Sequence, residues 1–142
     1  MSEQPLVWNS ISEGDEITAL RKQPSYMQLF MFSAATWNRH LIHYNTEFAH
    51  GDGLADVAPH RALIGSFLAQ MLSNWAGDAG RVSRLEWSVR GSALPGKDLT
   101  CKGTVVSKRF EGDKRLVECS VWAEDEEGVS LAPGKAVVTF FE

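Results

Sequence analysis

Residues 61–89 decide the fold class, and they read RALIGSFLAQMLSNWAGDAGRVSRLEWSV. Large apolar side chains recur in the first half of this stretch at the spacings of three and four that mark one face of an α-helix: Leu63, Ile64, Phe67, Leu68, Met71, Leu72 and Trp75. A helix is therefore predicted from about Arg61 to Trp75, with Gly77 as its stop. Because several of the intervening residues are small, such a helix can lie deep against a sheet.

After Gly80 the apolar period changes to two, which is the period of a β-strand. The alternating runs and the final strand cover residues 84–90, 99–105, 117–123 and 136–141, and turn-forming residues lie between them at 95–98, 111–113 and 124–128. Consecutive strands joined by short turns predict an antiparallel meander. The predicted fold class is therefore α+β, with one long apolar helix packed on an antiparallel sheet of four or more strands.

The chain before residue 61 has the composition of helices and loops. Pro24 and Ser25 precede a run that is helical in composition, from Tyr26 to Met31, and a proline there suits a helix N-terminus. Residues 46–49 are typical of a short helix, and the Gly-Asp-Gly at 51–53 predicts a loop.

Composition limits the class of protein. The 142 residues are 44% hydrophobic and carry a formal net charge of −4, which excludes a disordered chain and suits a single domain over residues 1–142. A mildly acidic chain binds nucleic-acid phosphates poorly, and the longest apolar segment, residues 62–76, is too short to span a bilayer. We therefore expect a cytoplasmic enzyme or binding domain, with neither a nucleic-acid nor a membrane partner.

The two cysteines do not form a disulfide framework. Cys101 and Cys119 fall in alternating apolar runs, so we expect reduced, buried thiols. Both flank one turn, so they could be neighbours in the folded sheet.

Groups that could carry chemistry gather between Thr36 and His60, where all four histidines of the chain lie: His40, His43, His50 and His60. The spacing of His40 and His43 could place two metal ligands on one side of a helical turn, but no Cys pair or His-Glu-x-x-His motif supports a metal site. Simple packing of these histidines is the other alternative. Nucleophilic catalysis has little support, because neither Cys has a His neighbour in sequence and no Gly-x-Ser-x-Gly is present. General acid–base chemistry fits better: His43 can exchange a proton near neutral pH, and Asn38 can orient a water or a carbonyl.

The stretch from Phe32 to Tyr44 reads FSAATWNRHLIHY. It resembles the MaoC-like hydratases and dehydratases, whose motif is Asp-x-Asn-Pro-Ile-His, and within them the type 2 hydroxyacyl-thioester dehydratase branch, with Phe-Ser-Ala-x-Thr-x-Asn-x-His-x-Ile-His-Tyr. A looser similarity continues at residues 59–63, Pro-His-Arg-Ala-Leu, where relatives often have Val-His-Gly-Pro-Leu. The resemblance covers roughly residues 28 to 108, and Arg61 replaces a family glycine.

The resemblance implies a hot-dog domain, in which an antiparallel sheet wraps a long helix, and a dimer with a continuous sheet. It implies an acyl thioester of coenzyme A or acyl carrier protein as substrate, with reversible (R)-type addition of water across the 2,3 double bond and no cofactor. Its catalytic residues would be His43, Asn38 and His40. The helix start at Arg61 and Ala62 would bind the enolate oxygen, His60 and Tyr44 would line the substrate site, and Arg61 could meet a phosphate of the carrier.

Two other functions remain open. Asn38 stands where many relatives have Asp, and the glycine is lost at Arg61, so the chain could be a non-catalytic or half-site subunit that works with an unlike hot-dog partner. A hot-dog thioesterase is the least favoured, because its nearest candidate carboxylates, Glu47 and Asp52, do not lie on the predicted central helix.

Overall fold

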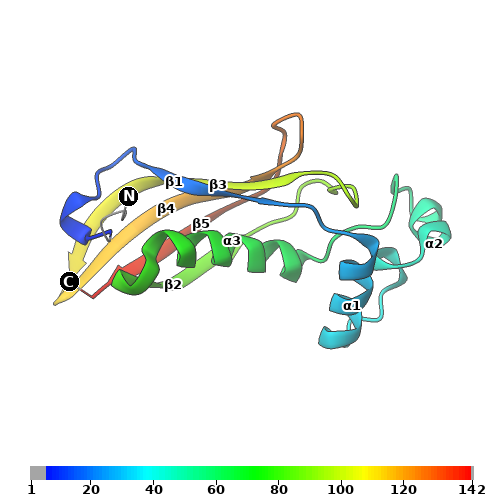
Figure 1. Cartoon of the computed structure of the whole chain (residues 1–142), viewed down its shortest axis with the longest axis horizontal. Helices are drawn as coiled ribbons and strands as arrows, with labels where there is room; N and C mark the ends of the chain where they lie inside the picture. Colours follow the sequence, from blue (N-terminus) through cyan, green and yellow to red (C-terminus); the bar gives the residue numbers. More distant parts are fainter. Residues whose placement is uncertain (1–5, 142) are drawn as a thin grey trace, which may run out of the picture.

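The structure is a computed structural model that describes residues 6–141, in which five strands form one antiparallel sheet around a long helix (Figure 1). The strands are β1 (Glu16–Lys22), β2 (Gly80–Trp87), β3 (Leu99–Glu111), β4 (Lys114–Glu124) and β5 (Ser130–Phe140). The α-helices are α1 (Tyr26–Thr36), α2 (Thr46–Gly51) and α3 (Arg61–Ala76), and three single-turn 3₁₀ helices are η1 (Trp8–Ser10), η2 (Leu41–His43) and η3 (Gly77–Ala79).

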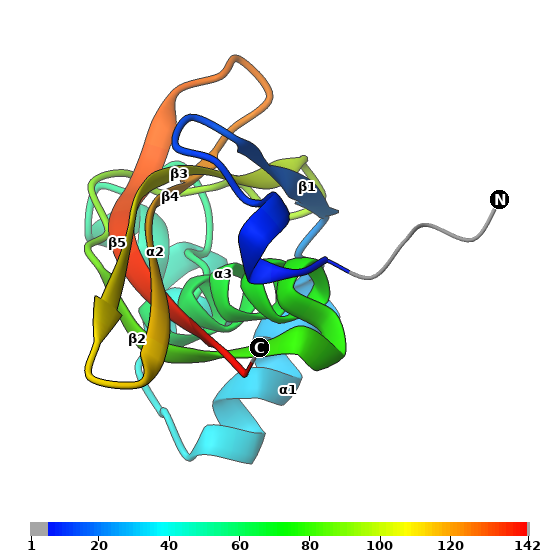
Figure 2. The same ribbon diagram turned by 90° about the vertical axis from the view of Figure 1, so that its left-hand side faces the viewer.

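The long helix α3 forms as the apolar spacing predicts. It runs from Arg61 to Ala76 and ends at Gly77, whose φ of 54° lies in the left-handed region and whose N–H donates to the carbonyl of Ser73. The sheet curves around this helix (Figure 2). The side chains that fill the space between them are buried: Leu63, Ile64, Phe67, Leu68, Met71 and Leu72 from α3, and Leu99, Cys101, Val117, Val121 and Val138 from the sheet. The predicted α+β fold is confirmed.

The predicted meander is correct for β3, β4 and β5 and wrong for β2. The strand order is β1-β3-β4-β5-β2, and β2 pairs with β5, with Leu85 opposite Ala136. The reason is geometric: β2 begins directly after η3, so it runs back along α3 at the far edge of the sheet. Residues 88–98 then lead from its end to the start of β3.

The strand β1 was not predicted, because its sequence lacks a clean alternation. The register against β3 shifts between Ile17 and Leu20, and within β1 only Ile17 is fully buried. A bulge of this kind inserts residues that do not follow the period of two.

The two cysteines are free and buried, as expected, but they are not neighbours. Cys101 lies opposite Ala123 and Cys119 lies opposite Val105 in the β3–β4 register, so the two are separated along the strands. Burial raises the pKa of both thiols to about 12, so they remain protonated.

The segment between β1 and α3 carries α1, η2 and α2, and it lies beyond one end of the sheet (Figure 1). The hydroxyl of Ser25 caps α1 by accepting from the N–H of Gln28 (3.1 Å), and Asn45 caps α2 by accepting from the N–H of Phe48 (2.8 Å). Both short helices were expected. Across residues 6–141, no helix combines the length and the apolar character needed to cross a membrane.

Candidate active site

The side chain of His43, in the last position of η2, is almost fully buried, with 8% of its surface exposed. Its Nδ1 lies 2.6 Å from the carbonyl oxygen of Ala58. Because a carbonyl only accepts, Nδ1 carries the proton of the neutral ring and Nε2 keeps its lone pair. The N–H of Ala58 in turn donates to the carbonyl of Ile42 (2.9 Å), so two hydrogen bonds hold the backbone at Ala58 against η2.

The surroundings of His43 keep its ring neutral. Burial lowers the pKa of His43 below 6.5, and this effect outweighs the hydrogen bond to Ala58, which acts in the opposite direction. The nearby His40 lowers the pKa of His43 further. A neutral imidazole with a free Nε2 is the form that can accept a proton.

A second histidine stacks on the first. His60, the N-cap of α3, is 1% exposed, and its ring centroid lies 3.8 Å from that of His43 with an interplanar angle of 20°. Its Nε2 shares a hydrogen bond of 2.6 Å with the hydroxyl of Ser33 on α1, and the ring of Phe32 lies 4.8 Å away. Burial, together with the adjacent His43, lowers the pKa of His60 to about 4, so this ring is neutral as well.

Asn38 and His40 lie in the exposed connection between α1 and η2. The Asn38 side-chain oxygen accepts from the backbone N–H of His40 (3.2 Å), and Nδ1 of His40 accepts from the N–H of Ile42 (3.4 Å). The His40 ring lies 6.0 Å from that of His43, edge to face. The structure thus brings His40, His43 and His60 into one cluster, with Asn38 next to it.

Three other expected site residues have different surroundings. The guanidinium of Arg61 donates to the carbonyl of Trp87 (2.7 Å) and lies over the Trp87 ring at 4.8 Å, while the indole N–H donates back to the carbonyl of Arg61 (2.9 Å). Tyr44 donates through its hydroxyl to the carbonyl of Arg39 (3.0 Å). Ala62 lies in the first turn of α3, before the first intrahelical bond, which runs from Ile64 to His60 (3.1 Å).

The remaining histidine, His50, bonds to its own loop and not to the cluster. Its Nε2 is 3.0 Å from the carbonyl of Ala55, which closes the loop after α2. Within residues 6–141, no group of three or more His, Cys, Asp or Glu side chains is placed to hold a metal ion.

Sequence reasoning did not assign a role to two groups that touch the histidines. Ser33 stands within the quoted stretch, but nothing in its spacing shows that its hydroxyl meets His60. The Ala58 partner of His43 is a backbone carbonyl, for which no residue type gives a signal.

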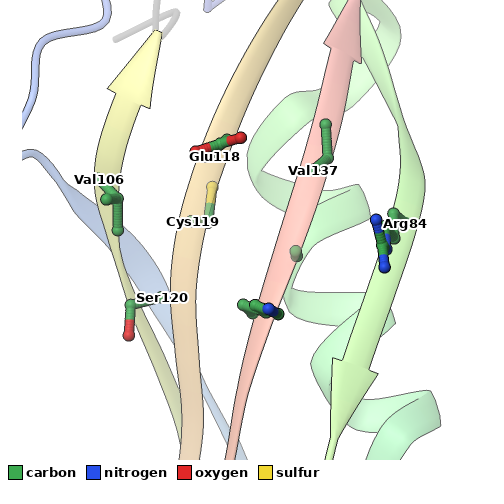
Figure 3. Close-up of a pocket in the computed structure, with 8 residues that line it drawn as sticks. Arg84, Val106, Glu118, Cys119, Ser120 and Val137 are labelled. Atoms are coloured by element: carbon green, nitrogen blue, oxygen red, sulfur yellow. The ribbon is translucent and has the colours of Figure 1, made fainter.

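Among several hollows on the surface, one of about 150 Å³ lies beside this cluster and is lined in part by Phe30, Ser33, Asn38 and Tyr44. Another, of about 300 Å³, lies on the sheet across β2 to β5, away from the cluster. Figure 3 labels part of its lining: Arg84, Val106, Glu118, Cys119, Ser120 and Val137. Hydrogen bonds from Ser107 and Arg109 lower the pKa of Glu118, and burial raises that of Cys119, so neither of these two groups exchanges protons near neutral pH.

The long helix inside a curved antiparallel sheet defines a hot-dog fold, and the histidine cluster lies at the start of that helix. The chain belongs to the hydroxyacyl-thioester dehydratase type 2 family, whose model matches residues 8–92. No curated protein sequence matches the chain at a significant level.

Solved structures share the fold at low identity. The (R)-hydratase from A. caviae, described as involved in PHA biosynthesis, is 19% identical with a TM-score of 0.82, over 92% of this chain and 98% of that one. The MaoC-like dehydratase from Rhodospirillum rubrum is 17% identical with a TM-score of 0.84, over 96% and 97%. A chain of the ChsH1-ChsH2 complex from Mycobacterium tuberculosis is 14% identical with a TM-score of 0.79, over 91% and 98%. These likenesses show the hot-dog fold.

Proposed function

We propose that this chain hydrates enoyl thioesters and dehydrates (R)-3-hydroxyacyl thioesters of coenzyme A or acyl carrier protein, in the cytoplasm and without a cofactor. The observation that carries the proposal is the buried, neutral His43, whose Nδ1 is held by the Ala58 carbonyl (2.6 Å) and whose Nε2 is left to exchange a proton. Membership of a family of hydratases and dehydratases supports it.

In the proposed hydration, Nε2 of His43 takes a proton from water as the oxygen of that water bonds to C3 of the substrate. The electron pair of the 2,3 double bond moves to C2 and the thioester oxygen, which becomes an enolate. The imidazolium then returns a proton to C2, so the ring ends neutral and one water has been added. Burial favours the return of the proton, because it destabilises the charged ring.

The enolate oxygen would lie at the first turn of α3, near the N–H of Ala62. Backbone N–H groups at a helix start precede the hydrogen-bonded ladder, and the helix dipole favours negative charge there. Asn38 would orient the water or the thioester, and His40 would assist from the edge of the His43 ring. Tyr44 would line the substrate site, and His60, which is 1% exposed, would contribute from behind His43. Arg61 would need to leave Trp87 to meet a carrier phosphate.

We also propose that the chain works with a second hot-dog subunit. Five large apolar side chains on and next to α1 are more than half exposed: Tyr26, Met27, Phe30, Met31 and Trp37. Apolar surface gathered on one element commonly marks an interface. The strand β2 is also an edge strand, which a partner sheet could continue.

The second candidate, a subunit that needs an unlike partner to be active, is favoured by one observation. Asn38 stands where many MaoC-like relatives have Asp, and its side-chain oxygen is occupied by the N–H of His40 (3.2 Å), so this position supplies no proton carrier. A thioesterase has weaker support, since the candidate carboxylates Glu47 and Asp52 lie on and just after α2, on the exposed surface.

The test is the hydration of crotonyl-CoA by the purified chain alone, followed as loss of the enoyl-thioester absorbance. We expect His43→Ala to lower kcat by about 100- to 10,000-fold, the usual contribution of a general acid–base group. The matched control is His50→Gln, because the His50 ring bonds the Ala55 carbonyl of its own loop, outside the cluster.

Turnover by folded His43→Ala within a few-fold of the unchanged chain would show that His43 is not the base. No turnover by the unchanged chain, with recovery on mixing with an unlike hot-dog subunit, would favour the half-site alternative. Release of free thiol without water addition would favour the thioesterase.

A further inference from the structure

His60 is packed on two sides by rings. The ring of His43 lies parallel to it at 3.8 Å, and the ring of Phe32 lies tilted at 4.8 Å. With 1% of its surface exposed, the His60 side chain has little room to rotate, and its ring covers one face of the His43 imidazole.

Ser33 holds the His60 ring in place through a hydrogen bond. Its hydroxyl and Nε2 of His60 are 2.6 Å apart, which joins α1 to the start of α3. The backbone of Ser33 is itself held at the end of α1, where its carbonyl accepts from the N–H of Asn38 (2.9 Å) beyond the left-handed residue Trp37 (φ 56°). Only 5% of the surface of Ser33 is exposed, so this hydrogen bond is shielded from competing water.

The identity of residue 60 is not explained by packing. In the described part of the chain, Nδ1 of His60 is buried and has no hydrogen-bond partner. A buried polar atom without a partner destabilises a fold, and native proteins keep such atoms mainly where they serve a purpose. A phenylalanine would place an aromatic ring there without that cost, but it could not bond the Ser33 hydroxyl.

We propose that Ser33 and His60 are positioning residues, which together hold the His43 imidazole in the orientation that bonds Nδ1 to Ala58 and leaves Nε2 to react. The inference rests on the proposed role of His43 as general base. His60 does not itself carry a proton in this scheme, because protonating it would place two cationic rings in face-to-face contact.

The groups that face His43 support this assignment. They are the neutral ring of His60 from α3, the edge of His40 from the start of η2, and the Ala58 carbonyl from the connection before α3. The His60 ring covers one face of the His43 ring, and burial lowers the pKa of His43. Truncation of the His60 ring would admit water to His43, so the pKa of His43 would rise toward 6.5. The acid limb of the kcat/KM profile would then move to higher pH.

The experiment compares His60→Ala, His60→Phe and Ser33→Ala, with Ser73→Ala as the control. Ser73 is an exposed serine in α3, three turns beyond the first turn of the helix. Each variant is first checked for folding by far-ultraviolet circular dichroism. Turnover of crotonyl-CoA is then measured against pH, and the imidazole ¹H–¹⁵N spectrum of His43 is titrated, which gives its pKa and its tautomer.

We expect His60→Ala to lower kcat on the order of 100-fold, the cost of a catalytic group displaced by about 1 Å, with a smaller change in KM. Ser33→Ala should lower kcat in the same direction. His60→Phe keeps a flat ring against His43 but cannot bond the Ser33 hydroxyl, so its kcat should match that of Ser33→Ala and stay above that of His60→Ala. Folded His60→Ala and Ser33→Ala variants with unchanged kcat and His43 pKa would overturn the inference, as would a loss in His60→Phe equal to that in His60→Ala.

The titration separates this inference from the proposed function. If the unchanged chain does not hydrate crotonyl-CoA, the proposed activity fails while the spectra still report whether Ser33 and His60 set the tautomer and pKa of His43. If the chain is active but the His43 signals do not respond to the variants, the positioning role fails alone.

Discussion

Gly65 allows the indole of Trp87 to lie directly against α3. A Cβ built on Gly65 would fall on the six-membered ring, 2.5 Å from Cε2 and 2.6 Å from Cη2 of Trp87. Real Cβ atoms do not approach carbon this closely, so in Gly65→Ala either the ring or the helix must move. The ring is held by its N–H bond to the Arg61 carbonyl (2.9 Å) and by the Arg61 guanidinium above it (4.8 Å).

The expected change follows from opposing contributions. Alanine in place of glycine inside a helix stabilises by about 1 kcal/mol. Overpacking costs about 2 kcal/mol, the lost indole hydrogen bond costs about 1 kcal/mol, and the lost cation–π contact costs about 0.5 kcal/mol. Gly65→Ala should therefore be destabilised by about 2.5 kcal/mol, which for a domain of this size lowers Tm by about 8 °C.

Urea denaturation followed by tryptophan fluorescence measures this free energy. Gly51→Ala is the matched control, because a Cβ at this helix end meets nothing within 4 Å. Trp87→Leu gives a sharper check: in that background the clash is relieved, and Gly65→Ala should become neutral or stabilising. A Gly65→Ala variant as stable as the unchanged chain would refute the packing argument.

Three further outcomes are expected. Burial raises the pKa of Cys101 and Cys119 to about 12, so a thiol reagent at pH 8 should label neither until urea unfolds the chain, and rapid labelling of the native protein would contradict their burial. His60 has a pKa of about 4 in the fold and 6.5 when unfolded, so between these values the unfolded chain binds a proton that the folded chain does not, and the free energy of unfolding should fall by up to about 3 kcal/mol as the pH drops from about 6.5 to about 4. In His60→Phe this part of the pH dependence should be absent. Urea denaturation of both proteins across this pH range measures it, and the same dependence of unfolding free energy on pH in both would refute it. The Lys108 ammonium donates to the Trp8 carbonyl (2.7 Å) and lies 4.0 Å from the centre of the Trp8 ring. Thermal denaturation should therefore show Lys108→Met to be less stable by about 2 kcal/mol. An unchanged stability would show that the N-terminal segment does not depend on this contact.

The sequence predicts α3 well, because its apolar residues keep a regular spacing from Leu63 to Trp75 and Gly77 ends the pattern. It predicts β3 and β4 for the same reason, with a period of two, and it places the final strand over residues 136–141, whereas β5 begins at Ser130. The bulge in β1 and the pairing of β2 with β5 are not accessible in this way, since both depend on how the sheet bends around the helix.

The candidate site is predicted in part. The clustering of histidines between Thr36 and His60 is visible in the sequence, and the structure places three of them together. Which ring nitrogen is free, and which ring stacks on which, depends on a backbone carbonyl at Ala58 and a hydroxyl at Ser33. Contacts across separate elements leave no local pattern, so the order of the rings had to come from the three-dimensional arrangement.

The position of α1, η2 and α2 beyond the end of the sheet has a consequence for motion. Their helical hydrogen bonds are made within the segment that connects β1 to α3. This segment can therefore open while the hydrogen bonds between the strands of the sheet stay formed. Amide protons of residues 26–51 should therefore exchange with solvent through a lower-energy opening than those of β3 and β4. Since such an opening separates Ser33 from His60, a warmed sample should lose its histidine stack at a lower temperature than its sheet.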